Sequence, residues 1–347
     1  YISMKTKHSF LIVLALVFEF INGFHDAANS IATVVTTRVL TPLQAVIWAA
    51  FFNFVAFFIA KYVIGEFGIA DTVSKTVIET YVTLPIVFSG LIAAIIWNLL
   101  TWWFGIPSSS SHTLIGAFAG AAIASAGFMS IHAGTIIIIA SFIVLAPLIG
   151  LIASVLISIL IMHLYRRVNP YRASTSFKRL QLVSSALLSI GHGLNDSQKV
   201  MGVIAAAMIA YTSANANVPA WLQLDHISNI PDWVPLSCFT VIALGTLSGG
   251  WKIIKTMGSG ITKITPLEGL ASQTASALTL FFVEIFKVPV STTHVITGSI
   301  MGAGAVKRLS AVRWGVSKKL VTAWILTIPV SALIAGIIYR VIGVWLY

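Results

Sequence analysis

The sequence is poor in charged residues and has a single cysteine. Only 9% of its 347 residues are charged, whereas 58% are hydrophobic; soluble domains carry roughly 25% charged residues. This composition excludes an ordinary soluble globular protein, and the lone Cys238 excludes an internal disulfide. Several apolar runs of about 18 residues or more predict membrane-spanning helices, so we expect an all-α polytopic membrane protein.

Acidic residues are the scarcer charge, with 10 Asp and Glu against 21 Lys and Arg and a formal net charge of +11. Such a surplus can indicate nucleic-acid binding. Here, however, the basic residues lie in short loops between apolar segments, where they set membrane orientation. We expect a lipid bilayer around the chain and no nucleic-acid partner. Residues 9–21 resemble a signal-peptide core without a cleavage site, so we expect them to remain as the first helix.

The apolar segments form two halves of matching order, joined by a basic linker at 166–179. In residues 1–165 we expect a helix over 9–40 that is broken near 22–30, then helices or hairpins over 43–61, 82–127 and 134–165. In residues 180–347 we expect a helix over 180–211 that is broken near 191–199, then elements over 235–251, 267–306 and 320–346. The segments over 82–127 and 267–306 are predicted helical hairpins, which gives about 10–12 membrane helices or half-helices in all.

Two duplicated motifs carry this internal repeat. "FGIPSSSSHTLIGAFAG" (104–120) aligns with "FKVPVSTTHVITGSIMG" (286–302), and "GFHDAANSIATVV" (23–35) resembles "GLNDSQKVMGVIA" (193–205). The paired glycines that follow each hairpin tip have the spacing of a close-packing helix surface. Near the second tip, Glu284 and Lys287 are close enough in sequence to form a local salt bridge.

Loop charges predict how the halves lie in the membrane. The positive-inside rule assigns the basic loops 166–179, 252–263 and 307–319 to the cytoplasm, and the acidic or neutral loops 61–81 and 212–234 to the outside. Equivalent loops then face opposite sides. We therefore predict an inverted two-fold repeat, as in many secondary transporters, with both termini external. Lys5 and Lys7 argue against an external N-terminus, and the longer loops outweigh them. Each hairpin is either re-entrant or fully spanning.

Glu19, Asp26, Asp196 and Lys199 fall inside predicted membrane segments. Each costs about 2.5–3.5 kcal/mol at a helix centre, which a structural role alone does not easily justify. The helix breaks and the Pro-Ser hairpin tips would together create four helix N-termini near the midplane, and such ends bind anions. The alternative role for the hydroxyl groups is helix–helix packing.

We therefore expect a tetrahedral oxyanion to bind between the motifs. The candidate substrate ligands are Asp26, Asn29, Ser108, Ser109, Ser110, Ser111, Asn195, Asp196, Lys199, Ser291, Thr292 and Thr293. Acids beside an anion need a coupling proton or cation, for which the candidates are Asp26, Asp196, Glu19 and Asn22. His112 and His294 could donate a hydrogen bond to the anion or carry a proton. The alternative is that each is a buried histidine with one backbone partner. No resident metal or cofactor is expected.

Four stretches, "NGFHDAANSIATV", "PSSSSHTLIG", "GHGLNDSQKVMG" and "PVSTTHVITG", resemble the inorganic phosphate transporter (Pit) family, in its bacterial branch. The resemblance covers essentially the whole chain. It implies a homodimer in the bacterial inner membrane that takes up inorganic phosphate by symport with protons or sodium. Lys199 departs from the family signature, which has Asn there. We hypothesise that this fixed ammonium replaces one coupling cation and favours proton symport, including transport of phosphate complexed with a divalent metal.

Three other functions are compatible with parts of the pattern. A sulfate permease of the same fold is the nearest, but two carboxylates suit phosphate, which keeps a proton that sulfate lacks. An intramembrane hydrolase would need one activated nucleophile, whereas the hydroxyls come in symmetric sets and no H-E-x-x-H motif occurs. A channel fits inverted broken repeats less well than a carrier does. We expect no enzyme.

Overall fold

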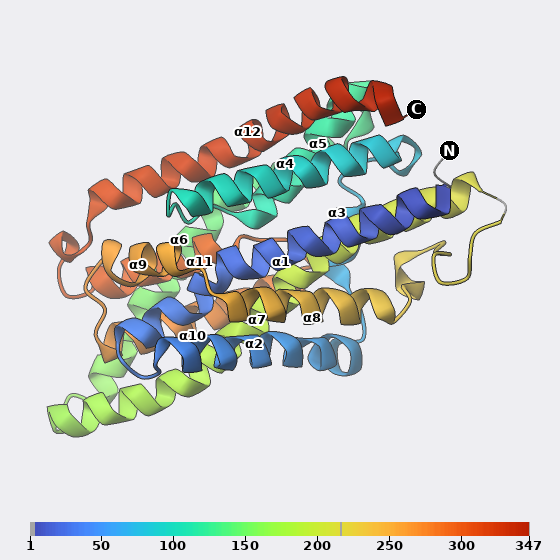
Figure 1. The fold of residues 1–347 in the computed structure, drawn as a ribbon. Helices are drawn as coiled ribbons and strands as arrows, with labels where there is room; N and C mark the ends of the chain where they lie inside the picture. The colour runs from blue at the N-terminus through green and yellow to red at the C-terminus, as the bar shows by residue number, and fades with distance from the viewer. Residues whose placement is uncertain (1–3, 216, 347) are drawn as a thin grey trace.

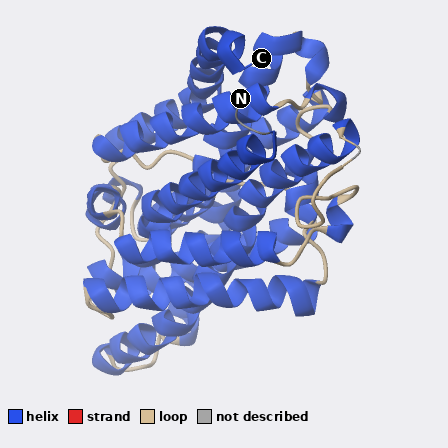
Figure 2. Cartoon of the chain, turned by 45° about the vertical axis from the view of Figure 1, so that its right-hand side comes forward, coloured by secondary structure: helices blue, strands red, loops and turns tan. Residues whose placement is uncertain are grey.

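The computed structural model describes residues 4–215 and 217–346, with side chains from His8 to Ile342 apart from residue 216. These residues form a bundle of helices that run mostly alongside one another (Figures 1 and 2). The described residues contain no strand, only an isolated bridge between Val77 and Ile131. The all-α fold class is therefore confirmed. The two chain ends, for which an external position is expected, lie outside the described residues.

The helices follow the same order in the two halves. The first half has α1 (Met4–Thr36), α2 (Pro42–Ile59), the short α3 (Gly68–Ser74), α4 (Leu84–Trp103), α5 (Ser110–Ala126) and α6 (Ala133–Leu164). The second half has α7 (Pro170–Ala214), α8 (Trp233–Ser248), the short α9 (Trp251–Lys255) with a π-helical turn at Thr256–Gly260, α10 (Pro266–Ile285), α11 (Thr292–Ala305) and α12 (Trp314–Leu346). Both hairpins, α4–α5 and α10–α11, lie within a few residues of the expected ranges.

The second arms of the two hairpins begin in the same way. Ser109 caps α5 by accepting a hydrogen bond from the backbone N–H of His112 at 3.1 Å, and Ser291 caps α11 by accepting one from His294 at 3.2 Å. A serine that satisfies a free N–H group fixes where a helix starts. The duplicated Ser-x-x-His spacing is thus a helix-start signal as well as a candidate site.

The expected breaks in the two long helices are wrong. Both α1 and α7 are helical through 22–30 and 191–199, and α7 also begins at Pro170, inside the segment expected as a linker. Two glycines in these segments pack closely against neighbouring helices. A Cβ on Gly23 would lie 2.3 Å from Ile242 O of α8, and one on Gly193 would lie 2.7 Å from Asn53 O of α2. The site therefore has two hairpin helix N-termini rather than four ends.

The halves are interleaved rather than side by side. Each outer helix packs on the hairpin of the other half, α12 on α5 and α6 on α11, as α12 and α5 show in Figure 1. A Cβ on Gly120 would lie 2.3 Å from Ala332 O, and one on Gly302 would lie 2.3 Å from Leu151 O. The glycine pairs therefore form the predicted close-packing surfaces, where only hydrogen fits between the helices.

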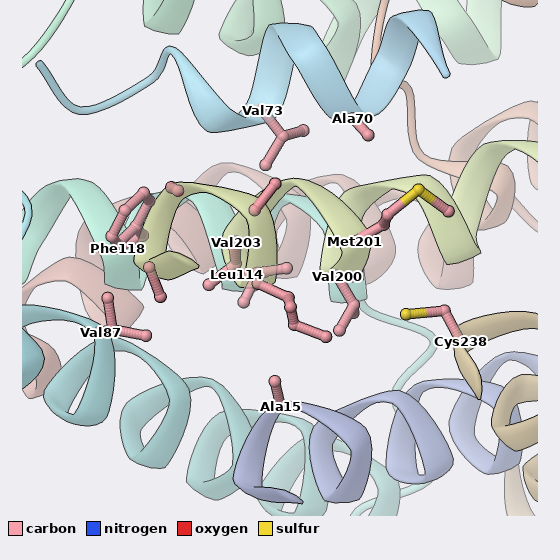
Figure 3. Packing of buried hydrophobic residues seen from close by; sticks show 14 of the residues in the cluster. Ala15, Ala70, Val73, Val87, Leu114, Phe118, Val200, Met201, Val203 and Cys238 are labelled. Atoms are coloured by element: carbon pink, nitrogen blue, oxygen red, sulfur yellow. The ribbon is translucent and has the colours of Figure 1, made fainter. Parts of the chain in front are cut away.

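The helix α7 lies at the centre of the main hydrophobic core. Figure 3 shows Met201 and its neighbours on α7 between Ala15 of α1, Leu114 of α5, Val73 of α3 and Cys238 of α8. Within the described residues, α1, α2 with its π-helical end, α4, α6 and α12 are long and apolar enough to cross a membrane, and α8 bends by 65° into the α9 segment. Because α6 and α12 bury little of their apolar surface, they suit contact with lipid.

Candidate functional site

The two repeated aspartates meet in the protein interior. Asp26 of α1, Asp196 of α7 and His192 of α7 each offer a ligand atom, and these three atoms lie within 4.8 Å of one another. All three side chains are buried. Two buried carboxylates this close repel each other unless a proton or a positive charge compensates them. The arrangement therefore creates a place for a cation.

One positive charge is supplied by Lys199, which is also fully buried. Its ammonium group donates at 2.6 Å to Asp196 Oδ1, to Ser111 Oγ and to the backbone oxygen of Val290. An ammonium has three N–H donors, so this geometry uses all of them. Lys199 thereby joins α7 to both hairpin tips at once.

Each aspartate also has a histidine partner. His25 Nδ1 lies 2.6 Å from Asp26 Oδ1, and His192 Nε2 lies 3.1 Å from Asp196 Oδ2. The two copies of the motif place the histidine differently. Asn195 stands at the position aligned with His25, and Asn22 stands at the position aligned with His192. Sequence reasoning left both histidines out of the candidate set. Their positions, directly before one aspartate and four residues before the other, are the signal that would have included them.

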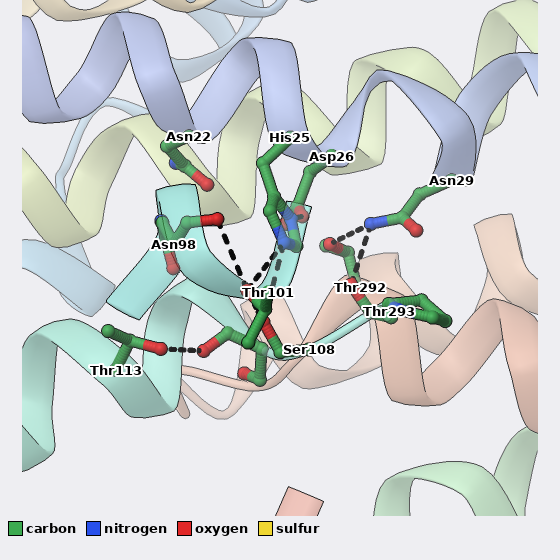
Figure 4. A network of polar contacts seen from close by, with 12 residues as sticks. Asn22, His25, Asp26, Asn29, Asn98, Thr101, Ser108, Thr113, Thr292 and Thr293 are labelled. Atoms are coloured by element: carbon green, nitrogen blue, oxygen red, sulfur yellow. Dashed lines mark hydrogen bonds and ion pairs between the residues drawn. The ribbon is translucent and has the colours of Figure 1, made fainter. Parts of the chain in front are cut away.

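The first hairpin contributes a chain of hydroxyl groups beside Asp26 (Figure 4). Ser108 Oγ lies 2.8 Å from Thr101 Oγ1, and both hydroxyls are within hydrogen-bond distance of His25 Nε2, at 3.4 and 3.2 Å. Ser109 is occupied as the helix cap, whereas Ser111 accepts from Lys199. Thr101, in the last turn of α4, is a site residue that the sequence patterns did not single out.

The second hairpin binds both long helices. Asn29 Nδ2 of α1 donates to Thr292 Oγ1 at 3.1 Å and to Thr293 Oγ1 at 2.9 Å (Figure 4). Thr292 Oγ1 in turn donates to Asp196 Oδ2 at 3.3 Å. The predicted residues Asn29, Asp196, Thr292 and Thr293 therefore come together, with Ser291 next to them as the cap of α11.

Several buried polar side chains around this cluster remain unsatisfied, and Asn195 and Ser110 are among them. Among the residues that the structure describes, neither the amide nitrogen nor the amide oxygen of Asn195 has a hydrogen-bond partner, and Ser110 Oγ has none. Both side chains are buried. Because buried polar groups are nearly always hydrogen-bonded, such groups indicate a place for a polar ligand. The site thus combines hydrogen-bond donors that have no partner, on Asn195 and Ser110, with the charged pair of Asp196 and Lys199.

The remaining candidates lie at the margin of the cluster. Glu19 is fully buried, accepts from Asn22 Nδ2 at 3.2 Å, and lies within electrostatic range of Asp196 and Lys199. The rings of His112 and His294 lie 5.0 Å apart where the two hairpins meet, and His294 also packs on Trp324 at 4.1 Å. The histidine pair thus forms a packing contact between the hairpin tips, and its role toward the anion or a proton stays a prediction.

Each hairpin tip is held by a short helix segment. Thr72 of α3 donates to the backbone oxygen of Lys287 at 2.9 Å, and Thr256, just after α9, donates to that of Gly105 at 2.9 Å. Gly105 and Lys287 occupy equivalent positions, and both have left-handed backbone, with φ of 65° and 57°. Lys287 pairs with Glu66 at 2.8 Å, so the expected salt bridge to Glu284 is wrong.

A cavity of about 910 Å³ lies on the α3 side of the second tip. Its lining includes Glu66 and Lys287, together with acidic and basic residues of the segments 61–82 and 225–232. The charged residues of these segments belong to the loops 61–81 and 212–234, which we expect to be external. We call this cavity the vestibule.

Comparison with known proteins identifies relatives along almost the whole chain. The profile of the phosphate transporter family matches residues 22–335. A Rhizobium meliloti protein named probable low-affinity inorganic phosphate transporter is 46% identical over 332 residues, which cover 95% of this chain and 94% of the relative. A Bacillus subtilis protein of the same name is 41% identical, with 96% of each chain covered.

The fold also matches a solved structure. The structure titled "The sodium-dependent phosphate transporter" superposes with a TM-score of 0.83 and 24% sequence identity. The match covers 98% of this chain and 99% of the other.

Proposed function

The chain belongs to the phosphate transporter family and is an inorganic phosphate transporter, and we propose that it takes up phosphate by proton symport with Lys199 as a built-in coupling cation. The observation that supports this coupling is the position of the Lys199 ammonium. It lies 2.6 Å from Asp196 and reaches both hairpin tips, beside the place that the two aspartates create for a cation.

The net charge of the site is the reason to expect that phosphate uptake is coupled to the uptake of a positive charge. With neutral histidines and a protonated Glu19, the charges of Asp26, Asp196 and Lys199 leave one net negative charge in a buried site. A further anion is costly there, because each uncompensated buried charge costs several kcal/mol. Phosphate must therefore arrive with protons, with a metal cation, or as a neutral complex with a divalent metal. Since Lys199 supplies one charge permanently, fewer mobile cations are needed.

We propose that Asn195, Ser110 and the starts of α5 and α11 bind the phosphate oxygens. These groups offer free donors and the positive ends of two helix dipoles, which suit an oxyanion. The aspartates would accept a proton from phosphate, a contact that sulfate cannot make. Glu19, which accepts a hydrogen bond from Asn22, is the proposed second position for a coupling proton, and the two residues together are the proposed position for another coupling cation. The inverted repeat, cytoplasmic basic loops, inner-membrane location and homodimer belong to this proposal.

Reconstituted transport tests the coupling. Uptake of labelled phosphate into proteoliposomes should respond to an imposed proton gradient without sodium, and added Mg²⁺ should increase it if a metal complex is carried. Sodium remains the alternative, because Asp26, His192 and Asp196 could hold a metal cation. Strict dependence on sodium with no response to pH would refute proton symport.

A further inference from the structure

Glu284 is a partly buried carboxylate with no role in the site described above. It lies in the last turn of α10, just before the second hairpin tip. Its Oε1 accepts a hydrogen bond from Gln198 Nε2 at 2.7 Å. Its Oε2 is buried and has no hydrogen-bond partner among the described residues. A carboxylate held by one oxygen and free at the other is suited to taking up and releasing a proton.

Gln198 holds this carboxylate in a fixed place. Its Oε1 accepts from the backbone N–H of Ile69 at the start of α3 at 3.1 Å, and its Nε2 also donates to the backbone oxygen of Leu194 at 2.9 Å. These contacts determine the orientation of the amide, so its nitrogen faces Glu284. Gln198 also lies directly before Lys199 and two residues after Asp196. Glu284 is thus connected to the helix that carries the site.

Charged groups of both the site and the vestibule act on Glu284. It is within electrostatic range of Lys199 on α7 and of Glu66, which lines the vestibule and pairs with Lys287. Of the other helices that pack on α10, α11 offers only His294 and α6 only His163 at its far end, whereas α1 carries Glu19, His25 and Asp26 of the site. The charged groups that act on Glu284 are Lys199 on the inner side and Glu66, which pairs with Lys287, on the outer side.

The first hairpin has no such carboxylate. The position equivalent to Glu284 is Trp102, which packs against Phe24, and the position equivalent to Gln198 is Ala28. The repeat otherwise matches closely around both tips. The Gln198–Glu284 pair is therefore a feature of the vestibule side alone, and a requirement of the fold would appear in both halves.

We propose that Glu284 is the carboxylate through which coupling protons pass from the vestibule to the Lys199–Asp196 pair, with Gln198 as its positioning residue. Glu284 takes a proton from water in the vestibule and becomes neutral. It then gives that proton up toward Asp196 and becomes a carboxylate again. Protonation of Asp196 removes the charge that holds Lys199. This inference rests on the proposed proton symport.

The test uses wild type, Glu284→Gln and Glu284→Asp in proteoliposomes with labelled phosphate. Gln keeps an oxygen that accepts from Gln198 but cannot carry a proton. We expect Glu284→Gln to lose proton-driven uptake by about tenfold or more, while phosphate exchange at equal pH on both sides stays at the wild-type level. Glu284→Asp should restore part of the proton-driven uptake. Glu79→Gln is the matched control, because Glu79 lines the same vestibule.

The outcomes separate this inference from the proposed function. If wild type itself ignores the proton gradient, proton symport fails, whatever Glu284 does. If wild type responds and Glu284→Gln responds equally, the role of Glu284 is refuted. Loss of exchange as well as of driven uptake in Glu284→Gln, with Glu79→Gln normal, would also overturn the proposal, because it would show that Glu284 only holds the hairpin in place.

Discussion

Asn29 donates to Thr293 across the two halves of the protein, with 2.9 Å between amide nitrogen and hydroxyl oxygen. The two residues are 264 positions apart in sequence, and the same amide nitrogen also donates to Thr292. This contact fixes the second hairpin tip against α1, next to Asp26. The site is therefore assembled only when both halves are folded.

Replacing Asn29 with Ala should weaken phosphate binding without unfolding the protein. Two hydrogen bonds worth about 0.5–1.5 kcal/mol each are lost, so we expect KM for phosphate to rise by about tenfold or more. Uptake kinetics at saturating proton gradient measure this. Thr322→Ala is a suitable control, because its hydroxyl bonds only within α12 at Lys318 O. An unchanged KM would contradict the role of the Asn29 contact.

Replacing Lys199 with Asn should change the coupling ion. Asn matches the family signature and removes the fixed ammonium from beside Asp196 and Ser111. The site then lacks one positive charge, so we expect uptake to require an added cation and to increase with sodium. Phosphate uptake measured against sodium concentration at constant pH tests this. Full sodium-independent uptake by Lys199→Asn would show that the ammonium takes no part in coupling.

The glycine surfaces should not tolerate even a methyl group. A Cβ on Gly302 would lie 2.3 Å from Leu151 O, so Gly302→Ala must separate α11 from α6. We expect a loss of about 1–3 kcal/mol, seen as a lower Tm in detergent. Gly315→Ala is the matched control, since its Cβ would meet nothing within 4 Å. Equal Tm values for the two variants would refute the packing role.

The two tip-holding threonines should act on opposite sides of the site. Thr72→Val removes the bond to Lys287 O and Thr256→Val the bond to Gly105 O, each worth about 1 kcal/mol. We expect the first change to expose the site more from the vestibule and the second to expose it more from the α9 side. The sole native cysteine makes this measurable: a Ser110→Cys, Cys238→Ala protein can be labelled from either face with an impermeant thiol reagent. Identical labelling of both variants would contradict this.

Sequence reasoning succeeded where local patterns determine structure. The Pro, Ser and His of each hairpin motif mark a tip and a helix start, and both tips lie where expected. It failed at the breaks expected near 22–30 and 191–199, because polar residues that contact neighbouring helices and polar residues at a helix break look alike without knowledge of the neighbours. The short helices α3 and α9 were not predicted either. They lie within segments expected as loops, and the hairpin tips that they contact are distant in sequence.

Long-range pairs in the site were equally out of reach. The acids and Lys199 were predictable from their cost in a membrane, and Asp26 and Asp196 do meet. The link from Gln198 to Glu284 and the bonds from Lys199 to both tips join segments that are 86 to 91 residues apart. No local spacing encodes such contacts.

Reconstituted phosphate uptake by wild type, Asp26→Asn and Asp196→Asn tests the central claim most directly. The account predicts that each substitution abolishes proton-driven uptake of labelled phosphate, while circular dichroism shows that each variant is still folded. Undiminished proton-driven uptake by both variants would show that the paired aspartates do not couple protons to phosphate.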